Sequence, residues 1–124
     1  MTQPLAFVVY ENVLLGNQLV NRLHDLGYRV TVVSPAKNLV AKAEEERPLV
    51  VVADLAARKE DLCTLIRQLR QNPPTSHIPV LAFLGEADDK IETAAHSAGA
   101  TLIALEKEML SQMPRLLAQV LEVE

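Results

Sequence analysis

Three acidic residues follow short apolar runs of this sequence, and their positions suit them to act together. Glu11, Asp54 and Glu106 each lie one or two residues beyond such a run. Carboxylates that gather without a counter-charge raise one another's pKa or bind a divalent cation, and oxygen ligands suit Mg²⁺, Mn²⁺ or Ca²⁺. Lys107 is the one basic partner that we assign to them. We therefore expect Glu11 and Asp54 to bind a metal weakly or not at all; the alternative is that Glu106 points to solvent and no site forms.

The sequence gives little support for nucleotide binding or for nucleophilic catalysis. The four glycines form neither a G-x-G-x-x-G nor a Walker pattern, so the sequence lacks the backbone loops that bind nucleotide phosphates. Cys63 is the single cysteine, and no serine or cysteine is placed beside a histidine in a way that suggests a nucleophile with its base. We expect neither an enzyme nor a nucleotide cofactor.

Composition and charge exclude two further classes of partner. The chain has 12 Lys and Arg against 16 Asp and Glu, a formal net charge of −4, with no Trp, two Tyr and two Phe. Such a surface suits neither phosphate backbones nor stacked bases, so we expect no nucleic-acid partner. No apolar run approaches the roughly 18 residues that a membrane span needs, and no basic segment precedes the first apolar run. These features favour a cytoplasmic protein without a membrane partner.

The elements that must position the acidic residues follow from the apolar runs. Five of them cover residues 5–9, 30–33, 49–53, 80–84 and 102–105, and they scarcely alternate with polar residues. Such runs are typical of strands covered on both faces. Segments with helical spacing lie between them, so strand and helix alternate five times. This pattern predicts one α/β domain over residues 1–124, with a doubly wound, five-stranded parallel sheet.

Parallel strands end at a common edge, and the functional site of an open α/β sheet lies beyond that carboxyl edge. We therefore expect the three acidic residues to converge there. The last helix should carry six apolar residues, with Pro114 in its first turn and Ser111 as a possible cap. The six residues are Leu110, Met113, Leu116, Leu117, Val120 and Leu121. They form a wider stripe than one buried face needs, which favours a covered surface over the alternative that they all pack inward.

Three segments, in order and at proper spacing, resemble the bacterial response-regulator receiver domain (CheY-like) over essentially the full chain. They are 47–55 (RPLVVVADL), 78–83 (IPVLAF) and 98–100 (AGA). The resemblance implies a flavodoxin-like (βα)5 fold with strand order 2-1-3-4-5. It also implies that Asp54 stands at the phospho-acceptor position.

The sequence departs from that family at the positions that handle phosphate. Tyr10 and Glu11 stand where the family has two acidic metal ligands, and Leu84 stands where it has a Ser or Thr. Ile103 replaces the aromatic switch residue and Glu106 replaces a Lys. The loop after Asp54 lacks the usual Met-Pro and is one residue shorter.

These departures lead to one preferred hypothesis and two alternatives. Phosphoryl transfer depends on positioning and on neutralising negative charge, so Glu106 in place of Lys opposes a phosphoryl group at Asp54. We expect an atypical receiver, a pseudo-receiver of two-component signal transduction, that acts through protein contacts with little or no aspartyl phosphorylation. The alternatives are a receiver that does accept phosphate on Asp54, and a flavodoxin-like module that binds a small ligand. The resemblance further implies a protein partner or a homodimer through the fourth helix, the fifth strand and the fifth helix.

Overall fold

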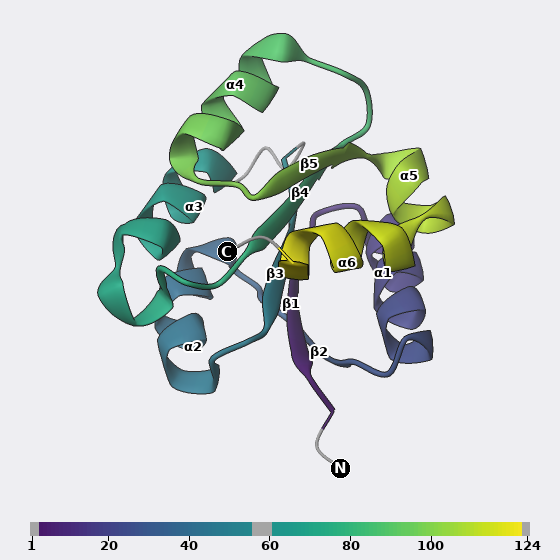
Figure 1. Cartoon of the computed structure of the whole chain (residues 1–124), viewed down its shortest axis with the longest axis horizontal. Helices are drawn as coiled ribbons and strands as arrows, with labels where there is room; N and C mark the ends of the chain where they lie inside the picture. The colour runs from purple at the N-terminus through teal and green to yellow at the C-terminus, as the bar shows by residue number, and fades with distance from the viewer. Residues whose placement is uncertain (1–2, 56–60, 123–124) are drawn as a thin grey trace.

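The computed structural model describes residues 3–55 and 61–122. Five parallel strands form one sheet in the order β2-β1-β3-β4-β5, as the resemblance implied (Figure 1). The strands are β1 (Leu5–Val9), β2 (Arg29–Val32), β3 (Val50–Asp54), β4 (Val80–Leu84) and β5 (Leu102–Leu105). Four of the predicted boundaries were wrong by one residue, because β2 covers residues 29–32 rather than 30–33 and β3 covers residues 50–54 rather than 49–53. Asp54 is therefore the last residue of its strand rather than the first residue beyond it.

Helices cover both faces of this sheet (Figure 1). One face carries α2 (Leu39–Glu46), α3 (Leu62–Gln71) and α4 (Asp89–Ala98). The other carries α1 (Val13–Asp25), α5 (Glu106–Ser111) and α6 (Met113–Glu122). Short 3-10 turns, η1 (Ala36–Asn38) and η2 (Pro73–Thr75), precede α2 and follow α3. None of the helices in the described ranges is both long and apolar enough to cross a membrane.

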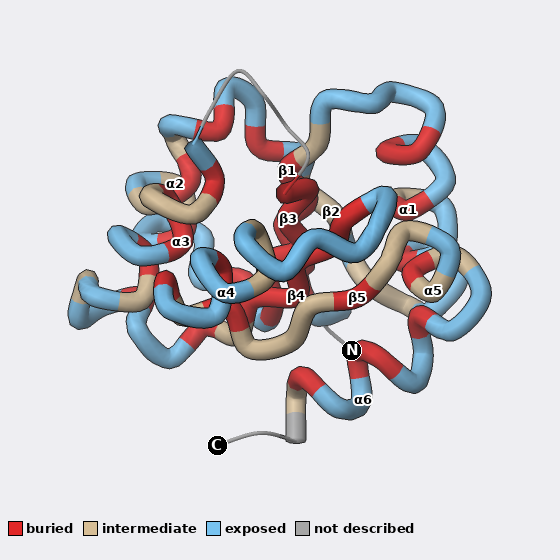
Figure 2. The backbone as a smooth tube through the Cα atoms, turned by 90° about the horizontal axis from the view of Figure 1, so that it is seen from above, coloured by how far each residue is buried: buried red, intermediate tan, exposed pale blue. Residues whose placement is uncertain are grey.

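The central strands are apolar on both sides because each side meets a helical layer. All residues of β1, β3 and β4 are buried, as Figure 2 shows, whereas β2 and β5 are the edge strands and are partly exposed. Successive side chains of β1 alternate between the two layers: Phe7 packs with α2, α3 and α4, and Val8 packs with α1, α5 and α6. The absence of polar alternation in the sequence is thus explained by burial of both faces.

Side-chain caps start three of the helices close to the carboxyl edge of the sheet. Asn12 accepts a hydrogen bond from the Leu15 backbone N–H (3.1 Å) at the start of α1. Asp61 caps α3 and Asp88 caps α4 in the same manner. The helix α4 ends at Gly99, whose φ of +113° is a left-handed conformation that glycine adopts without strain.

The last helix was wrongly predicted as one continuous element. The structure has two helices, α5 and α6, separated at Gln112. Ser111 does not cap α6, because it ends α5 and its hydroxyl donates to the Lys107 carbonyl (2.9 Å). Pro114 does lie in the first turn of α6, where its missing N–H costs no hydrogen bond.

The wide apolar stripe of this region packs mostly inward, which weakens the argument that a partner covers part of it. Met113, Leu116, Leu117 and Val120 are buried in the core between α1, α6 and the sheet. The remaining two residues, Leu110 and Leu121, are half-buried and pack against the same core. Two short helices present a wider face to the sheet than one helix does, so the six residues need no second protein.

Candidate functional site

The phospho-acceptor position lies at the carboxyl edge of the sheet. Asp54 ends β3 with 5% of its surface exposed, and it pairs in register with Phe83 of β4. The next residue, Leu55, donates its backbone N–H to the Phe83 carbonyl (2.9 Å), which holds the end of β3 against β4. Glu11 lies in the bend after β1 and is exposed. Strand β1 pairs directly with β3, so both acidic residues stand at neighbouring strand ends.

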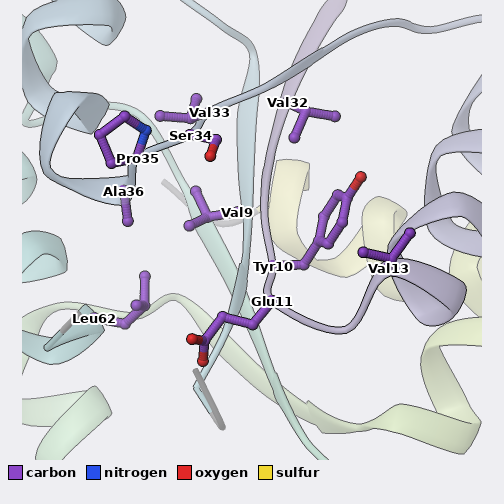
Figure 3. A pocket seen from close by; sticks show the side chains of 10 residues that line it. All are labelled: Val9, Tyr10, Glu11, Val13, Val32, Val33, Ser34, Pro35, Ala36 and Leu62. Atoms are coloured by element: carbon purple, nitrogen blue, oxygen red, sulfur yellow. The ribbon is translucent and has the colours of Figure 1, made fainter. Parts of the chain in front are cut away.

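Tyr10 occupies the first of the two acidic positions of the family, but its side chain is turned away from that edge position. Its half-buried ring lies against the backbone of α1 at Gly16: a Cβ built on Gly16 would stand 2.1 Å from the ring carbon Cε2. In Figure 3 the Tyr10 ring extends towards Val13 and Val32, whereas Glu11 extends the other way, towards Leu62. The strand β1 thus offers one carboxylate at this edge.

Leu84 and Glu106 occupy the positions of the family's hydroxyl and lysine. Leu84 is 3% exposed and packs into the core below α2, α3 and α4. Glu106 is the first residue of α5 and is half-buried. Its Oε2 lies 3.5 Å from the point that a Cβ on Gly85 would take, so the carboxylate stands over the end of β4. Glu106 therefore does not simply extend into solvent, as one expectation had it.

The expected cluster of three carboxylates was wrong. Within residues 3–55 and 61–122, no three His, Cys, Asp or Glu side chains come together closely enough to hold a metal ion. Glu11, Asp54 and Glu106 thus do not form one group, although all three follow strands. Weak binding of Mg²⁺ by Glu11 and Asp54, with water completing its shell, stays a prediction. Residues 56–60 are outside the described residues, and so is most of the loop expected to be one residue shorter.

Ile103 packs where the family has an aromatic switch residue. It is half-buried on β5 and contacts the same core that receives Leu84. Lys107, the predicted basic partner of the acidic residues, is exposed in the first turn of α5. The other acidic residue of this turn, Glu108, accepts a hydrogen bond at Oε1 from the backbone N–H of Leu105 (3.0 Å). The first turn of α5 therefore carries two carboxylates and one cation.

The N-terminus of α3 contributes a further carboxylate near this edge. Asp61 accepts hydrogen bonds from the Thr64 backbone N–H (3.2 Å) and the Thr64 hydroxyl (2.7 Å). These bonds favour the ionised form, and they lower the pKa of the Asp61 carboxyl. The neighbouring Cys63 is half-buried, and desolvation by burial raises the pKa of its thiol, with the charge of Asp61 adding to the effect. Cys63 is a poor nucleophile in this setting.

A hollow of about 580 Å³ opens beside Tyr10 and Glu11 (Figure 3). Its described walls come from the ends of β1 and β2, the loop before η1, and the starts of α1 and α3. They are mostly apolar, and Ser34, Glu11 and the Tyr10 side chain supply polar groups. Asp54 is not among these wall residues. Sequence reasoning missed both this hollow and the role of Gly16; a glycine on the buried side of a helix was the available signal.

By fold, the chain is similar to the response-regulator receiver domains of the CheY-like kind. It shares with them the sheet order, the two helical layers and an aspartate at the end of β3. No protein-family model matches the sequence. The chain is 34% identical over 95 residues to the transcriptional regulatory protein PhoP of Escherichia coli strain K12 and to the virulence transcriptional regulatory protein PhoP of Shigella flexneri. The match covers 77% of this chain and 42% of each relative, so the chain spans less than half of their length.

Solved structures agree with this class. FixJ-N superposes with a TM-score of 0.85 at 21% identity, covering 100% of this chain and 98% of that one. The receiver domain of the sensor histidine kinase PA1611 of Pseudomonas aeruginosa PAO1, which coordinates magnesium in its cleft, gives 0.87 at 20% identity, covering 98% and 100%. The chemotaxis response regulator CheY4 of Vibrio cholerae gives 0.79 at 18% identity, covering 93% and 99%. At these identities the likeness establishes the fold.

Proposed function

We propose that this receiver domain is a pseudo-receiver, which works in two-component signalling through protein contacts and carries little or no phosphate on Asp54. The observation that carries the proposal is the pair of side chains, Leu84 and Glu106, at the end of β4. Leu84 is buried there without a hydroxyl, and the Glu106 carboxylate lies beside Gly85.

The chemical reason lies in the charge of the phosphoryl group. Its transfer and retention need cations or hydrogen-bond donors around the equatorial oxygens. Leu84 has no donor, and Glu106 adds negative charge where a cation would be needed. The switch of the family needs a hydroxyl that draws an aromatic ring inward, and neither Leu84 nor Ile103 supplies these parts. Signalling by this domain therefore depends on a binding surface that is present without phosphorylation, rather than on a conformational change driven by phosphate.

Exposure to acetyl phosphate with Mg²⁺, followed by intact mass measurement, tests the proposal. We expect no stoichiometric gain of one phosphate. The matched control is Asp54→Asn, treated in parallel. A full mass increase that disappears in Asp54→Asn would contradict the proposal and support the alternative, a phospho-accepting receiver with Asp54 as acceptor.

The surface formed by α4, β5 and the predicted fifth helix, which the structure divides into α5 and α6, is the proposed place for the partner, which can be a second copy of the chain. On α4 the exposed residues Thr93, Ala94 and Ser97 are small and allow close approach. On the edge strand β5, Leu102, Ile103 and Leu105 are half-buried. Small residues beside a partly exposed apolar edge suit a protein contact.

The hollow beside Tyr10 favours a second candidate, a flavodoxin-like module that binds a small ligand. Its volume of about 580 Å³ falls within the range of small-molecule sites, and it lies at the carboxyl edge where such folds bind ligands. A ligand-observed NMR screen tests this function. The variant Ser34→Tyr fills the hollow and should abolish any binding, whereas the control Ser76→Tyr, at an exposed position after η2, should not.

A further inference from the structure

A second hollow lies at the opposite, amino-terminal edge of the sheet. It measures about 450 Å³, and its walls come from the starts of β1 and β2, the segments before β3 and β4, and the end of α6. All of these strand starts are remote from the carboxyl edge that carries Asp54. The function of this hollow is therefore independent of the phospho-acceptor position.

Basic side chains gather around this hollow. Arg29, Arg47 and His77 line it, and all three are exposed. Glu46 is the one acidic residue among the described walls, and its carboxylate pairs with the Lys42 ammonium at 3.8 Å. The chain as a whole carries a net charge of −4. A cationic hollow on an acidic protein concentrates anions locally, because the field of the two guanidinium groups is opposed there by one carboxylate that already has a partner.

Arg47 holds a backbone conformation that arginine rarely adopts. It follows α2 as the C-cap with φ +50° and ψ +67°, and its N–H donates to the Ala43 carbonyl at 2.9 Å. Glycine is the usual residue at a left-handed helix end, because a Cβ is strained there. Residues strained in this way cluster at binding and catalytic sites. At this position the side chain of Arg47 lines the hollow.

Apolar side chains form the remainder of the walls. Leu49 is 44% exposed, which makes it one of the few large apolar residues left open to solvent in the described chain. Leu121 and Pro79 lie in the same hollow and are half-buried. Guanidinium groups beside an exposed leucine match a ligand that has both an anionic head and an apolar body.

We infer that this hollow binds an organic anion in which a carboxylate is joined to an apolar body. The planar guanidinium of arginine binds a carboxylate through two parallel hydrogen bonds, and Arg47 can supply such a pair of donors. The Nε of Arg29 donates to the Gln3 carbonyl (3.2 Å), which leaves its two Nη groups for the ligand. The apolar body lies against Leu49 and Leu121. The volume suits a small molecule, since such sites commonly measure about 300–1,000 Å³.

Titration of the full chain with sodium octanoate, followed by ¹H–¹⁵N NMR, tests this inference. Amides around the hollow should shift with saturation, whereas acetate, which lacks the apolar body, and octylammonium, which has the opposite charge, should leave them unchanged. Octyl phosphate separates the two kinds of anionic head, and tighter binding of octyl phosphate than of octanoate would contradict a carboxylate ligand. No saturable shift with millimolar octanoate, or equal shifts with acetate or octylammonium, would overturn the inference.

The variant Arg47→Gly separates loss of binding from loss of folding. Glycine suits the left-handed backbone at this position, so the melting temperature should be unchanged or higher. Loss of the guanidinium should weaken octanoate binding about tenfold or more. Leu49→Asn should weaken it as well, whereas Arg67→Gln, on the exposed side of α3, serves as a matched control with full affinity. Unchanged affinity in Arg47→Gly would show that the hollow is not the binding site.

Discussion

The Tyr10 ring packs against Gly16, and this contact requires that residue 16 has no side chain. The Tyr10 ring lies where a Cβ on Gly16 would stand, 2.1 Å from Cε2, and this separation is far below ordinary van der Waals contact. Gly16→Ala should therefore force the ring or α1 to move and lower the free energy of unfolding by about 1–3 kcal/mol. Urea unfolding followed by circular dichroism measures this change.

The double variant separates this clash from the general effect of alanine in a helix. In the background Tyr10→Ala, the same Gly16→Ala change should stabilise α1 by about 0.5–1 kcal/mol, because alanine is a better helix former than glycine. The sign of the effect thus reverses with the ring present or absent. Equal effects in both backgrounds would mean that the ring does not need Gly16.

A second prediction concerns the replaced phosphate-handling residues. Leu84→Thr with Glu106→Lys and Tyr10→Asp restores a hydroxyl, a cation and a second carboxylate around Asp54. This triple variant should gain phosphate from acetyl phosphate with Mg²⁺, detectable as a mass increase that the further change Asp54→Asn removes. The single variant Glu106→Gln is the control, since it removes the negative charge without supplying a cation. No gain in the triple variant would show that the defect lies elsewhere, with the loop after Asp54 as the next segment to test.

The sequence could place these residues at one edge but could not orient their side chains. Asp54 and Glu11 were predicted there because parallel strands end together, and the structure has both at neighbouring strand ends. The direction of Tyr10 depends on Gly16, and that of Glu106 depends on the space beside Gly85. Such packing is decided between separate elements, so no local pattern in the sequence reports it.

At the scale of single elements, the cap of α3 makes stability depend on pH. Hydrogen bonds from Thr64 lower the pKa of Asp61 in the folded protein. A lowered folded-state pKa stabilises the protein above the unfolded-state pKa of about 3.9, and this contribution is lost as the pH falls through the folded-state value. Asp61→Ala should cost about 0.5–2 kcal/mol at pH 7 through loss of the cap.

Asp61→Asn isolates the contribution of the charge, because asparagine keeps the capping oxygen without ionising. Its free energy of unfolding should lie below that of the parent at pH 7, and the two should converge as the pH is lowered below about 4. The control is the background Thr64→Val, which removes the hydroxyl that donates to Asp61 and in which Asp61→Asn should show a smaller pH-dependent difference. A constant difference from pH 7 to pH 2 would contradict the argument.

Element types followed from the sequence more directly than element ends. Strands buried on both faces leave long apolar runs in the sequence, so five strands were predicted, and residues 3–55 and 61–122 contain five. The break at Gln112 was missed because apolar residues continue on both sides of it at helical spacing. Pro114 signalled the start of a helix, but periodicity alone does not show that an earlier helix ends two residues before it.

At the scale of the whole molecule, the two edges of the sheet carry different chemistry. The carboxyl edge holds Asp54 and Glu106, whereas the amino edge holds Arg29 and Arg47 beside apolar walls. Inward packing of α6 accounts for its apolar width, so that width is no evidence for a protein partner. The proposed surface is that of α4, the edge strand β5 and the exposed sides of α5 and α6.

Self-association through α4, β5 and the last two helices, α5 and α6, gives the final prediction. Sedimentation velocity at increasing micromolar concentrations should show a dimer that grows with concentration, because the small residues of α4 allow two copies to approach closely. Ala94→Arg places a long cation on the exposed side of α4 and should leave a monomer with an unchanged melting temperature. Ala41→Arg makes the same change on the exposed side of α2, outside the proposed surface, and should leave the dimer intact. A parent protein that stays monomeric at every concentration, or a dimer that persists in Ala94→Arg, would remove this surface as the site of self-association.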